Sequence, residues 1–284
     1  MIFVSSASVK KKNLGEILNY FEKNNIQNVE LSGGTEYKKN ISKIISKHNK
    51  RMNFMIHNYF PPPKKDFILN LGSLDEKTRL KSVSLCKKAI NLCKKFEVKK
   101  YAVHAPFLID FLPNEAGKLI RKRKLSNKNK VIMQFKKSWL EIKKVANNSV
   151  DLYIENNVLS FENYKNYNCK NPFLFTDYKS YLFLKKKIDF NLLLDIGHLY
   201  VSAKTLRKNF LKECLNLAKL TDYFHISNNN GKRDENRGLK IDGEIYKILK
   251  RNIIPSNSTL TLEIYENINI IKKNIKLIEN LKKK

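Results

Sequence analysis

Short apolar runs alternate with longer segments of helical period along the whole chain. Residues 2–5 (IFVS) form the first apolar run, and residues 12–24 then carry apolar side chains at helical spacing. This is the pattern of a strand followed by a helix, and it recurs to the end of the sequence. We predict eight strands, at 2–5, 27–32, 52–57, 99–104, 151–156, 190–195, 222–227 and 259–264.

Helical patterns follow the predicted strands. They cover 12–24, 36–48, 75–96, 131–148, 199–219, 243–251 and 267–282, and the chain after the fifth strand is helical or irregular to 187. Eight such alternations in 284 residues favour a closed parallel barrel over an open doubly wound sheet, whose usual strand count is lower. No glycine-rich nucleotide fingerprint follows the first strand, which weakens the open-sheet alternative further. We therefore predict an α/β fold, a (β/α)8 TIM barrel that forms a single domain over residues 1–284.

Three connections at the presumed catalytic face are long: 58–74, 105–130 and 228–242. Loops of more than about 12 residues commonly act as lids or binding loops. The first contains Pro61, Pro62 and Pro63, and because proline removes backbone freedom, we expect that loop to be a stiff wall of the pocket.

The net charge of +30 invites a nucleic-acid interpretation, because phosphate neutralisation needs clustered Lys and Arg. The clustering is weak, since lysines are spread over nearly every predicted helix together with abundant Asn and Ile. A solvated lysine surface that reflects coding bias is the simpler interpretation. The densest basic run, residues 118–124 (KLIRKRK), is either a solvated loop or a contact for an anionic substrate or polyanion.

The remaining composition points to a cytoplasmic protein without a membrane partner. No apolar stretch approaches the roughly 20 residues needed to cross a bilayer, and the start, MIFVSSASVKKK, has its apolar part before its charges, opposite to a secretory signal. The four cysteines, Cys86, Cys93, Cys169 and Cys214, form no CxxC pair. We expect them to be reduced thiols in the core.

Acidic residues and histidines stand where predicted strands end, although a parallel strand buried on both faces is normally apolar throughout. The set comprises His57, His104, Glu155, Asp195, His198, His225, Asp234 and Glu263. Strand carboxyl ends of a barrel face one common mouth, and carboxylates crowded together there need a cation or protons. The sequence therefore predicts a divalent metal site.

Glu155, Asp195, His225 and Glu263 make a set of three carboxylates and one imidazole, which suits Mn²⁺, Mg²⁺, Co²⁺ or Zn²⁺. His198 belongs to the segment DIGH. There Gly197 lets the backbone turn, and His198 is a metal ligand, a substrate hydrogen-bond donor or a cap of the following helix.

The other histidines allow two interpretations. His57 and His104, from neighbouring strands, together with His198 and Asp234 could form a second metal site or bind substrate; each of the two strand histidines could instead be a hydrogen-bonded core residue. His48, at the polar end of the helix predicted at 36–48, is expected on the surface.

Taken together, these motifs resemble the xylose isomerase-like barrel superfamily, which contains sugar isomerases and epimerases and the type IV apurinic endonucleases. The resemblance covers nearly the whole chain. The segments that carry it are VELSGG (29–34), HNYFPPP (57–63), ILNLGSLDEKTRLKSV (68–83), VHAPF (103–107), YIENN (153–157), LLDIGH (193–198), FHISNNNGKRDENRG (224–238) and LEIYE (262–266).

The two branches of this superfamily imply different metal sets. Resemblance to the nucleases implies three zinc ions held by all eight residues of the set above and by a histidine two positions after Asp234. This chain has Asn236 there, and a neutral amide is a much poorer zinc ligand than imidazole. Resemblance to the isomerases and epimerases implies one metal, held by Glu155, Asp195, His225 and Glu263, a set that is complete here.

The complete set suits proton transfer on a carbohydrate. A divalent ion that holds a sugar carbonyl oxygen and the adjacent hydroxyl makes the C–H bond between them more acidic by stabilising the enediolate. Glu155 and Glu263 could then serve as base and acid. His198 would orient a substrate oxygen, and Lys232, Arg233 or Arg237 would hold a phosphate or carboxylate, unless they are solvated loop charges.

The preferred hypothesis is thus a metal-dependent sugar or sugar-phosphate isomerase or epimerase with a small-molecule carbohydrate substrate. One alternative is a zinc-dependent endonuclease that cleaves DNA at abasic sites. Another is a barrel that binds a ligand without turnover, since a fold specifies a scaffold better than a reaction.

Overall fold

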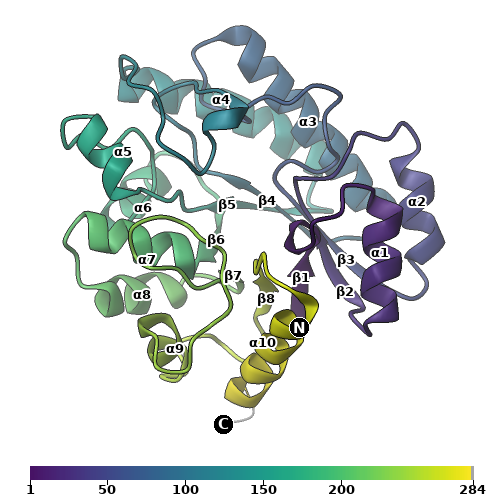
Figure 1. Cartoon of the computed structure of the whole chain (residues 1–284). Coiled ribbons are helices and arrows are strands. Elements are labelled where there is room, and N and C mark those ends of the chain that lie inside the picture. Colours follow the sequence, from purple (N-terminus) through teal and green to yellow (C-terminus); the bar gives the residue numbers. More distant parts are fainter. Residues whose placement is uncertain (283–284) are drawn as a thin grey trace.

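Eight parallel strands close into a barrel in the computed structural model, which describes residues 1–282 (Figure 1). The strands are β1 (Ile2–Ser5), β2 (Asn28–Leu31), β3 (Asn53–His57), β4 (Lys100–His104), β5 (Asp151–Glu155), β6 (Asn191–Asp195), β7 (Tyr223–Ile226) and β8 (Thr259–Leu262). They follow one another around the barrel in sequence order, and β1 pairs with β8. The predicted (β/α)8 TIM barrel is confirmed.

Helices surround the barrel on its outside (Figure 1). They are α1 (Leu14–Lys23), α2 (Ile41–His48), α3 (Glu76–Lys95), α4 (Lys128–Ala146), α5 (Phe161–Asn166), α6 (Tyr178–Lys185), α7 (Ile196–Thr205), α8 (Phe210–Ala218), α9 (Glu244–Leu249) and α10 (Ile268–Lys282). Two short 3₁₀ turns, Ser6–Ser8 and Pro113–Glu115, were not predicted. Each long helix buries an apolar stripe against the strands, as its helical period indicated.

The helix predicted at 199–219 is wrong in its continuity. The structure has α7 and α8 instead, because Arg207 adopts a left-handed φ of 55° and ends the first helix. The side chain of Asn209 then accepts a hydrogen bond from the Lys212 N–H and caps the second helix. Apolar spacing continues across the break, so periodicity alone does not reveal it.

Two expectations about burial were also wrong. Cys169 is exposed, whereas Cys86, Cys93 and Cys214 are buried in the core. His48 is buried rather than on the surface, and its Nδ1 lies 3.4 Å from Glu22 Oε2 on α1. The helix that carries His48 begins at Ile41 and not at 36, and the histidine lies on its buried face with Ile41 and Ile45.

The long connections predicted at the catalytic face are present after β3, β4 and β7. The second of them is held in shape by Glu115, whose buried carboxylate accepts hydrogen bonds from the N–H groups of Leu112 (2.7 Å) and Arg121 (3.0 Å). It also pairs with Arg123 Nη2 at 2.8 Å. The Arg123 pair and these backbone donors lower the pKa of Glu115 to about 2.

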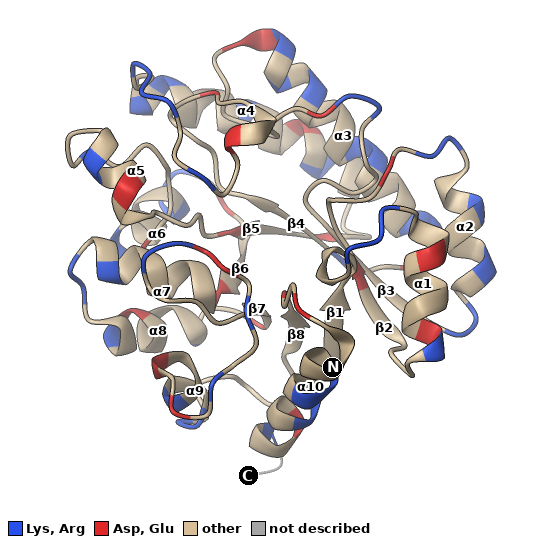
Figure 2. Cartoon of the chain, viewed as in Figure 1, with Lys and Arg blue, Asp and Glu red and all other residues tan. Residues whose placement is uncertain are grey.

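Basic residues are distributed around the molecule rather than gathered on one face. Figure 2 shows Lys and Arg on most of the outer helices and on several loops. Acidic residues on the outside are fewer, and many are paired with lysine or arginine, as Glu244 is with Lys204 at 2.8 Å. Within residues 1–282, no helix combines the length and the apolar character that spanning a membrane requires.

Replacing Glu115 with Ala should loosen the loop after β4 without unfolding the barrel. Three donors lose their common acceptor, so we expect amide hydrogen exchange in residues 112–123 to rise on the order of tenfold at pH 7. The same loosening should appear in the unaltered protein only when the pH falls from the ordinary glutamate range toward about 2, because the pKa of the folded carboxyl is depressed. Glu36→Ala, at an exposed glutamate, is the control. Equal exchange in both variants would contradict the anchoring role.

Candidate metal centre

The barrel brings together, at the carboxyl ends of its strands, the acidic and histidine residues that the sequence singled out. His57, His104, Glu155, Asp195 and His225 end or nearly end five consecutive strands. Glu263 follows β8, His198 lies in the first turn of α7, and Asp234 lies in the loop after β7. Strand register aligns two neighbouring pairs directly, His104 with Glu155 and Asp195 with His225.

Glu155 lies at the middle of this set and is fully buried. Its Oε2 accepts a hydrogen bond from His57 Nε2 at 2.8 Å and lies 3.3 Å from His104 Nδ1. Its Oε1 lies 3.4 Å from His225 Nδ1 and 3.6 Å from His198 Nδ1. Burial by itself would raise the pKa of Glu155, but His104 and His57 outweigh burial and hold that pKa well below its ordinary value.

His225 joins Glu155 to the other two carboxylates that the sequence assigned to the same metal. Ligand atoms of Glu155, Asp195 and His225 all lie within 4.8 Å of one another, and Glu263 Oε1 is 3.6 Å from His225 Nδ1. One imidazole nitrogen therefore faces two carboxylates, and an oxygen of the third carboxylate lies within 4.8 Å of a nitrogen of the same ring. A second group with the same spacing consists of His104, Glu155 and His198, so Glu155 belongs to both.

Local structure at the start of α7 aims Asp195 at this point. Asp195 Oδ1 accepts a hydrogen bond from the His198 N–H at 2.7 Å and caps the helix, which leaves Oδ2 to face the centre. A Cβ on Gly197 would lie 2.5 Å from Ser227 Oγ. The glycine is thus required for the close approach of α7 to the chain after β7, and not for a turn of the backbone as the sequence suggested.

Several buried polar atoms in this cluster have no hydrogen-bond partner among residues 1–282: Glu155 Oε1, Asp195 Oδ2, His104 Nδ1, His225 Nδ1 and Asp234 Oδ1. Buried polar atoms are almost always bonded, so such exceptions require an explanation. Burial, with repulsion by Glu155 set against attraction by His198, raises the pKa of Asp195 to about 7. Crowded carboxylates whose free oxygens face imidazole nitrogens fit a divalent cation.

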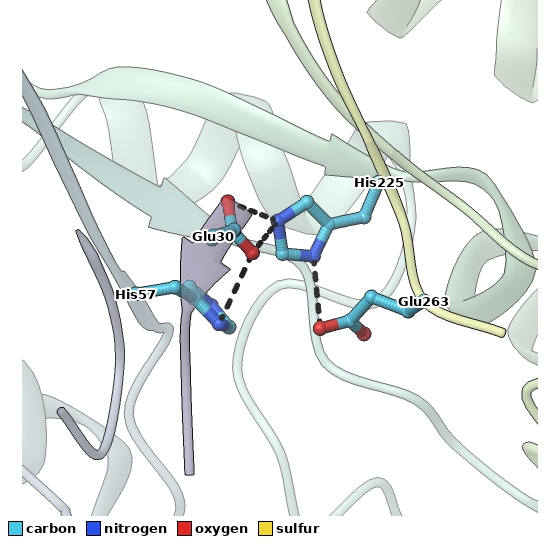
Figure 3. Close-up of side chains that lie close together, drawn as sticks. All are labelled: Glu30, His57, His225 and Glu263. Carbon is cyan, nitrogen blue, oxygen red and sulfur yellow. Dashed lines mark hydrogen bonds and ion pairs between the residues drawn. The ribbon is translucent and has the colours of Figure 1, made fainter. Parts of the chain in front are cut away.

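Glu30 is a buried member of the cluster that strand-end reasoning missed. It lies on β2, is 0% exposed, and meets His57, His225 and Glu263 in the interior of the barrel (Figure 3). The signal was present in the sequence, because Glu30 interrupts the apolar run VEL at 29–31. It precedes the last residue of its strand, so the rule that strand ends face the mouth of the barrel does not select it.

Asn236 occupies the position where the nuclease pattern has its ninth ligand. Its Nδ2 donates a hydrogen bond to Asp234 Oδ2 at 3.0 Å, and the same oxygen lies 3.3 Å from His198 Nε2. The amide therefore takes up part of the acceptor capacity of Asp234. With only His198 and Asp234 as strong ligands, a third zinc position here would be weaker than one with a second imidazole.

A pocket of about 330 Å³ opens beside His104 and His198. Its walls include Phe107, Phe111 and Phe173, from the loops after β4 and β5. Tyr59 and Ile68 from the loop after β3 also line it, and its charged lining residues include Lys118, Arg233, Glu162 and Asp234.

The predicted substrate-binding residues differ in where they lie relative to this pocket. His104, His198 and Arg233 line it, whereas His57 is buried within the cluster and does not line the pocket. Lys232 and Arg237 are exposed on the same loop as Arg233 but do not belong to the lining. Arg233 and Arg237 lie 3.9 and 3.5 Å from Glu235.

Comparison with solved structures shows the same fold in two classes of enzyme. A D-tagatose 3-epimerase-like protein superposes with a TM-score of 0.71 at 18% identity, covering 99% of this chain and 96% of that one. A 3-keto-D-glucoside 4-epimerase from E. coli gives 0.64 at 11%, covering 100% and 99%. Endonuclease IV from Thermus thermophilus gives 0.62 at 13%, covering 99% and 98%. At these identities the likeness shows the fold alone.

No curated protein matched the sequence in a direct comparison. The family model described as the xylose isomerase-like TIM barrel, in contrast, matches residues 12–281, which is nearly the whole chain. The resemblance that the strand-end motifs indicated is confirmed: this chain belongs to the xylose isomerase-like TIM barrel family.

Proposed function

We propose that this chain is a divalent-metal-dependent isomerase or epimerase of sugars or sugar phosphates. The observation that carries the proposal is the grouping of Glu155, Asp195 and His225 at ligand spacing, with Glu155 and Glu263 both facing Nδ1 of His225. Free buried oxygens and nitrogens face one another there instead of being bonded to the protein. The ligand set that this activity requires is complete, and epimerases occur among the structures of the same fold.

The proposed chemistry divides the work between the cation and two glutamates. When bound, the cation would act as a Lewis acid on the carbonyl and neighbouring hydroxyl oxygens of the sugar. Glu155 on β5 and Glu263 after β8 would exchange a proton with the carbon between those oxygens, one as base and the other as acid. His57 supports this role, because its hydrogen bond to Glu155 Oε2 favours the ionised carboxylate and leaves Oε1 facing the centre.

The pocket beside the cluster suits the rest of the substrate. His104 and His198 stand between the carboxylates and the aromatic walls, where their ring nitrogens can bind sugar hydroxyls. Arg233, with its side chain 65% exposed, is placed to pair with a phosphate or carboxylate at the far end of a substrate. This arrangement is compatible with both free and phosphorylated sugars.

A zinc-dependent endonuclease is the second candidate, and a specific observation favours it. His57 and His104 both approach Glu155 Oε2, and His104, Glu155 and His198 form a second group with ligand spacing. A one-metal isomerase does not need that group. Against the nuclease stands the use of Asn236 as a hydrogen-bond donor to Asp234, which weakens the third metal position.

Metal content separates the two candidates. After incubation with Mn²⁺ or Zn²⁺ and gel filtration, we expect elemental analysis to give about one equivalent per chain, as a single catalytic ion requires. Asp195→Asn should lose nearly all of it, because it removes one of three charged ligands. Asp242→Asn, at an exposed aspartate of the loop after β7, should retain it. About three equivalents of metal would favour the nuclease. A protein that retains no metal would contradict both candidate functions.

Proton exchange tests the proposed reaction directly. In D₂O, the metal-loaded protein should exchange a carbon-bound proton of at least one member of a panel of ketopentoses, ketohexoses and their phosphates, followed by proton NMR. Glu263→Gln should slow this exchange about 100-fold or more, since proton transfer by a placed carboxyl contributes at least that factor. Glu244→Gln, on the exposed side of α9, is the control.

A parallel assay with DNA distinguishes the isomerase from the nuclease. The same preparations, loaded with zinc, are given a DNA duplex that contains one abasic site. Incision of that duplex without any sugar exchange would overturn the isomerase assignment in favour of the nuclease.

A further inference from the structure

We infer that Glu30 is a positioning residue that sets the ring orientation and tautomer of His225, so that Nδ1 of this imidazole faces the metal centre. The inference rests on the proposed metal-dependent function and adds to it a residue outside the predicted ligand set. Figure 3 shows Glu30 on one side of the His225 ring and Glu263 on the other.

The surroundings of Glu30 are built to keep a carboxylate in the barrel interior. Burying a charge is costly unless it is paired and hydrogen-bonded. Glu30 Oε2 accepts hydrogen bonds from the Tyr223 hydroxyl, from Thr261 Oγ1 at 2.9 Å and from His225 Nε2 at 3.2 Å. These donors come from β7 and β8, on the far side of β1 from Glu30, so three strand positions cooperate to hold one carboxylate.

The contact with His225 determines which nitrogen is free. Glu30 Oε1 lies 3.0 Å from His225 Nε2, and an ionised carboxylate can only accept a hydrogen bond. Nε2 must therefore carry the hydrogen. The lone pair of the neutral ring then lies on Nδ1, the atom that faces Glu155 Oε1 and Glu263 Oε1 at 3.4 and 3.6 Å. Carboxylates that hold metal-binding histidines in this way also make the ring a better ligand.

Glu30 also stands beneath a second imidazole. Its Oε1 is 4.0 Å from His57 Nδ1, and the His57 and His225 rings meet edge to face with centroids 4.7 Å apart. The other nitrogen of His57 is bonded to Glu155 Oε2. The Glu30 carboxylate is thus close to two of the four histidines around Glu155, one at each of its oxygens.

Direct ligation by Glu30 is the competing role, because ligand atoms of Glu30, His57, His225 and Glu263 also lie within 4.8 Å of one another. Two features favour positioning. Three donors converge on Glu30 Oε2, and the imidazole nitrogen nearest to Glu30 is the one already bonded to it. Glu30 Oε1 has no hydrogen-bond partner within the described part of the chain, but a cation held by that oxygen and by His225 Nε2 would have to displace the hydrogen bond from His225 Nε2 to Glu30 Oε2.

Metal titration of Glu30→Gln tests the inference. We expect isothermal titration with Mn²⁺ to give the stoichiometry of the unaltered protein with an affinity about 10- to 100-fold weaker, the usual effect of losing such a partner. Glu30→Asp keeps the negative charge but moves it away from the His225 ring, so we expect a similar loss of Mn²⁺ affinity in this variant. Glu36→Gln, an exposed glutamate shortly after the same strand, should bind like the unaltered protein. Circular dichroism identifies any variant that fails to fold. If Glu30→Gln does not fold, the Mn²⁺ affinity of Glu30→Asp tests the inference in its place.

The tautomer supplies an independent readout. In zinc-loaded protein with ¹⁵N-labelled histidine, NMR should show His225 protonated on Nε2 and bound through Nδ1, with slow exchange of the Nε2 proton that becomes fast in Glu30→Gln. Unchanged affinity in both Glu30 variants, or His225 bound through Nε2, would overturn the inference and leave the proposed function intact. Loss of one metal equivalent in Glu30→Gln would overturn it in favour of direct ligation. An unaltered protein that binds no Mn²⁺ would overturn both.

Discussion

The candidate site depends on one electrostatic constraint, which is the burial of more carboxylates than imidazoles at one end of a barrel. Glu30, Glu155, Asp195 and Glu263 are buried with His57, His198 and His225 around them. Transfer of each carboxylate from water costs several kcal/mol unless a positive partner compensates. Protons on the histidines can supply part of that compensation: burial would lower the pKa of His225, but Glu30 and Glu263 raise it well above the ordinary value. A divalent cation would supply it more compactly, and several ligand atoms in the described chain that face inward without a bond are placed where they could bind one.

The barrel makes this crowding tolerable because it fixes the backbone before the side chains meet. Strand register aligns His104 with Glu155 and Asp195 with His225, so neighbouring ligands lie side by side without any loop having to position them. Asn156 then ties the ends of β5 and β6 together, since its Nδ2 donates to the Asp195 carbonyl and its Oδ1 accepts from the Asp195 N–H. These candidate ligands therefore lie on the strands of the barrel, and the loops supply the pocket walls.

The fold and much of the cluster followed from the sequence because both depend on short-range patterns. A buried parallel strand is apolar, and a charged residue at its end is visible as an exception, as Glu155 and Asp195 are. Glu30 is also visible as an exception, since it interrupts the apolar run at 29–31, but it lies before the end of its strand. Its role is not visible locally, because its partners Tyr223 and Thr261 are 193 and 231 residues away in sequence. The break before α8 and the burial of His48 depend on single backbone angles and on packing between helices. Such angles and packing are determined by tertiary structure, and the period of the apolar residues does not show them.

Within this family, the fold does not choose between sugar chemistry and phosphodiester cleavage, since epimerases and endonuclease IV superpose on the chain similarly well. The choice therefore rests on individual side chains. One carboxylate oxygen of Glu155 lies beside His57 and His104, and the other lies beside His225 and His198. This arrangement is compatible with two adjacent cations as well as with one. Asn236 acts in the opposite direction, because its amide donates to Asp234 instead of offering an imidazole lone pair. The four residues of the proposed one-metal site, Glu155, Asp195, His225 and Glu263, are all present, whereas the position of Asn236 lacks an imidazole. This difference is the basis for proposing proton transfer on a small substrate rather than DNA cleavage.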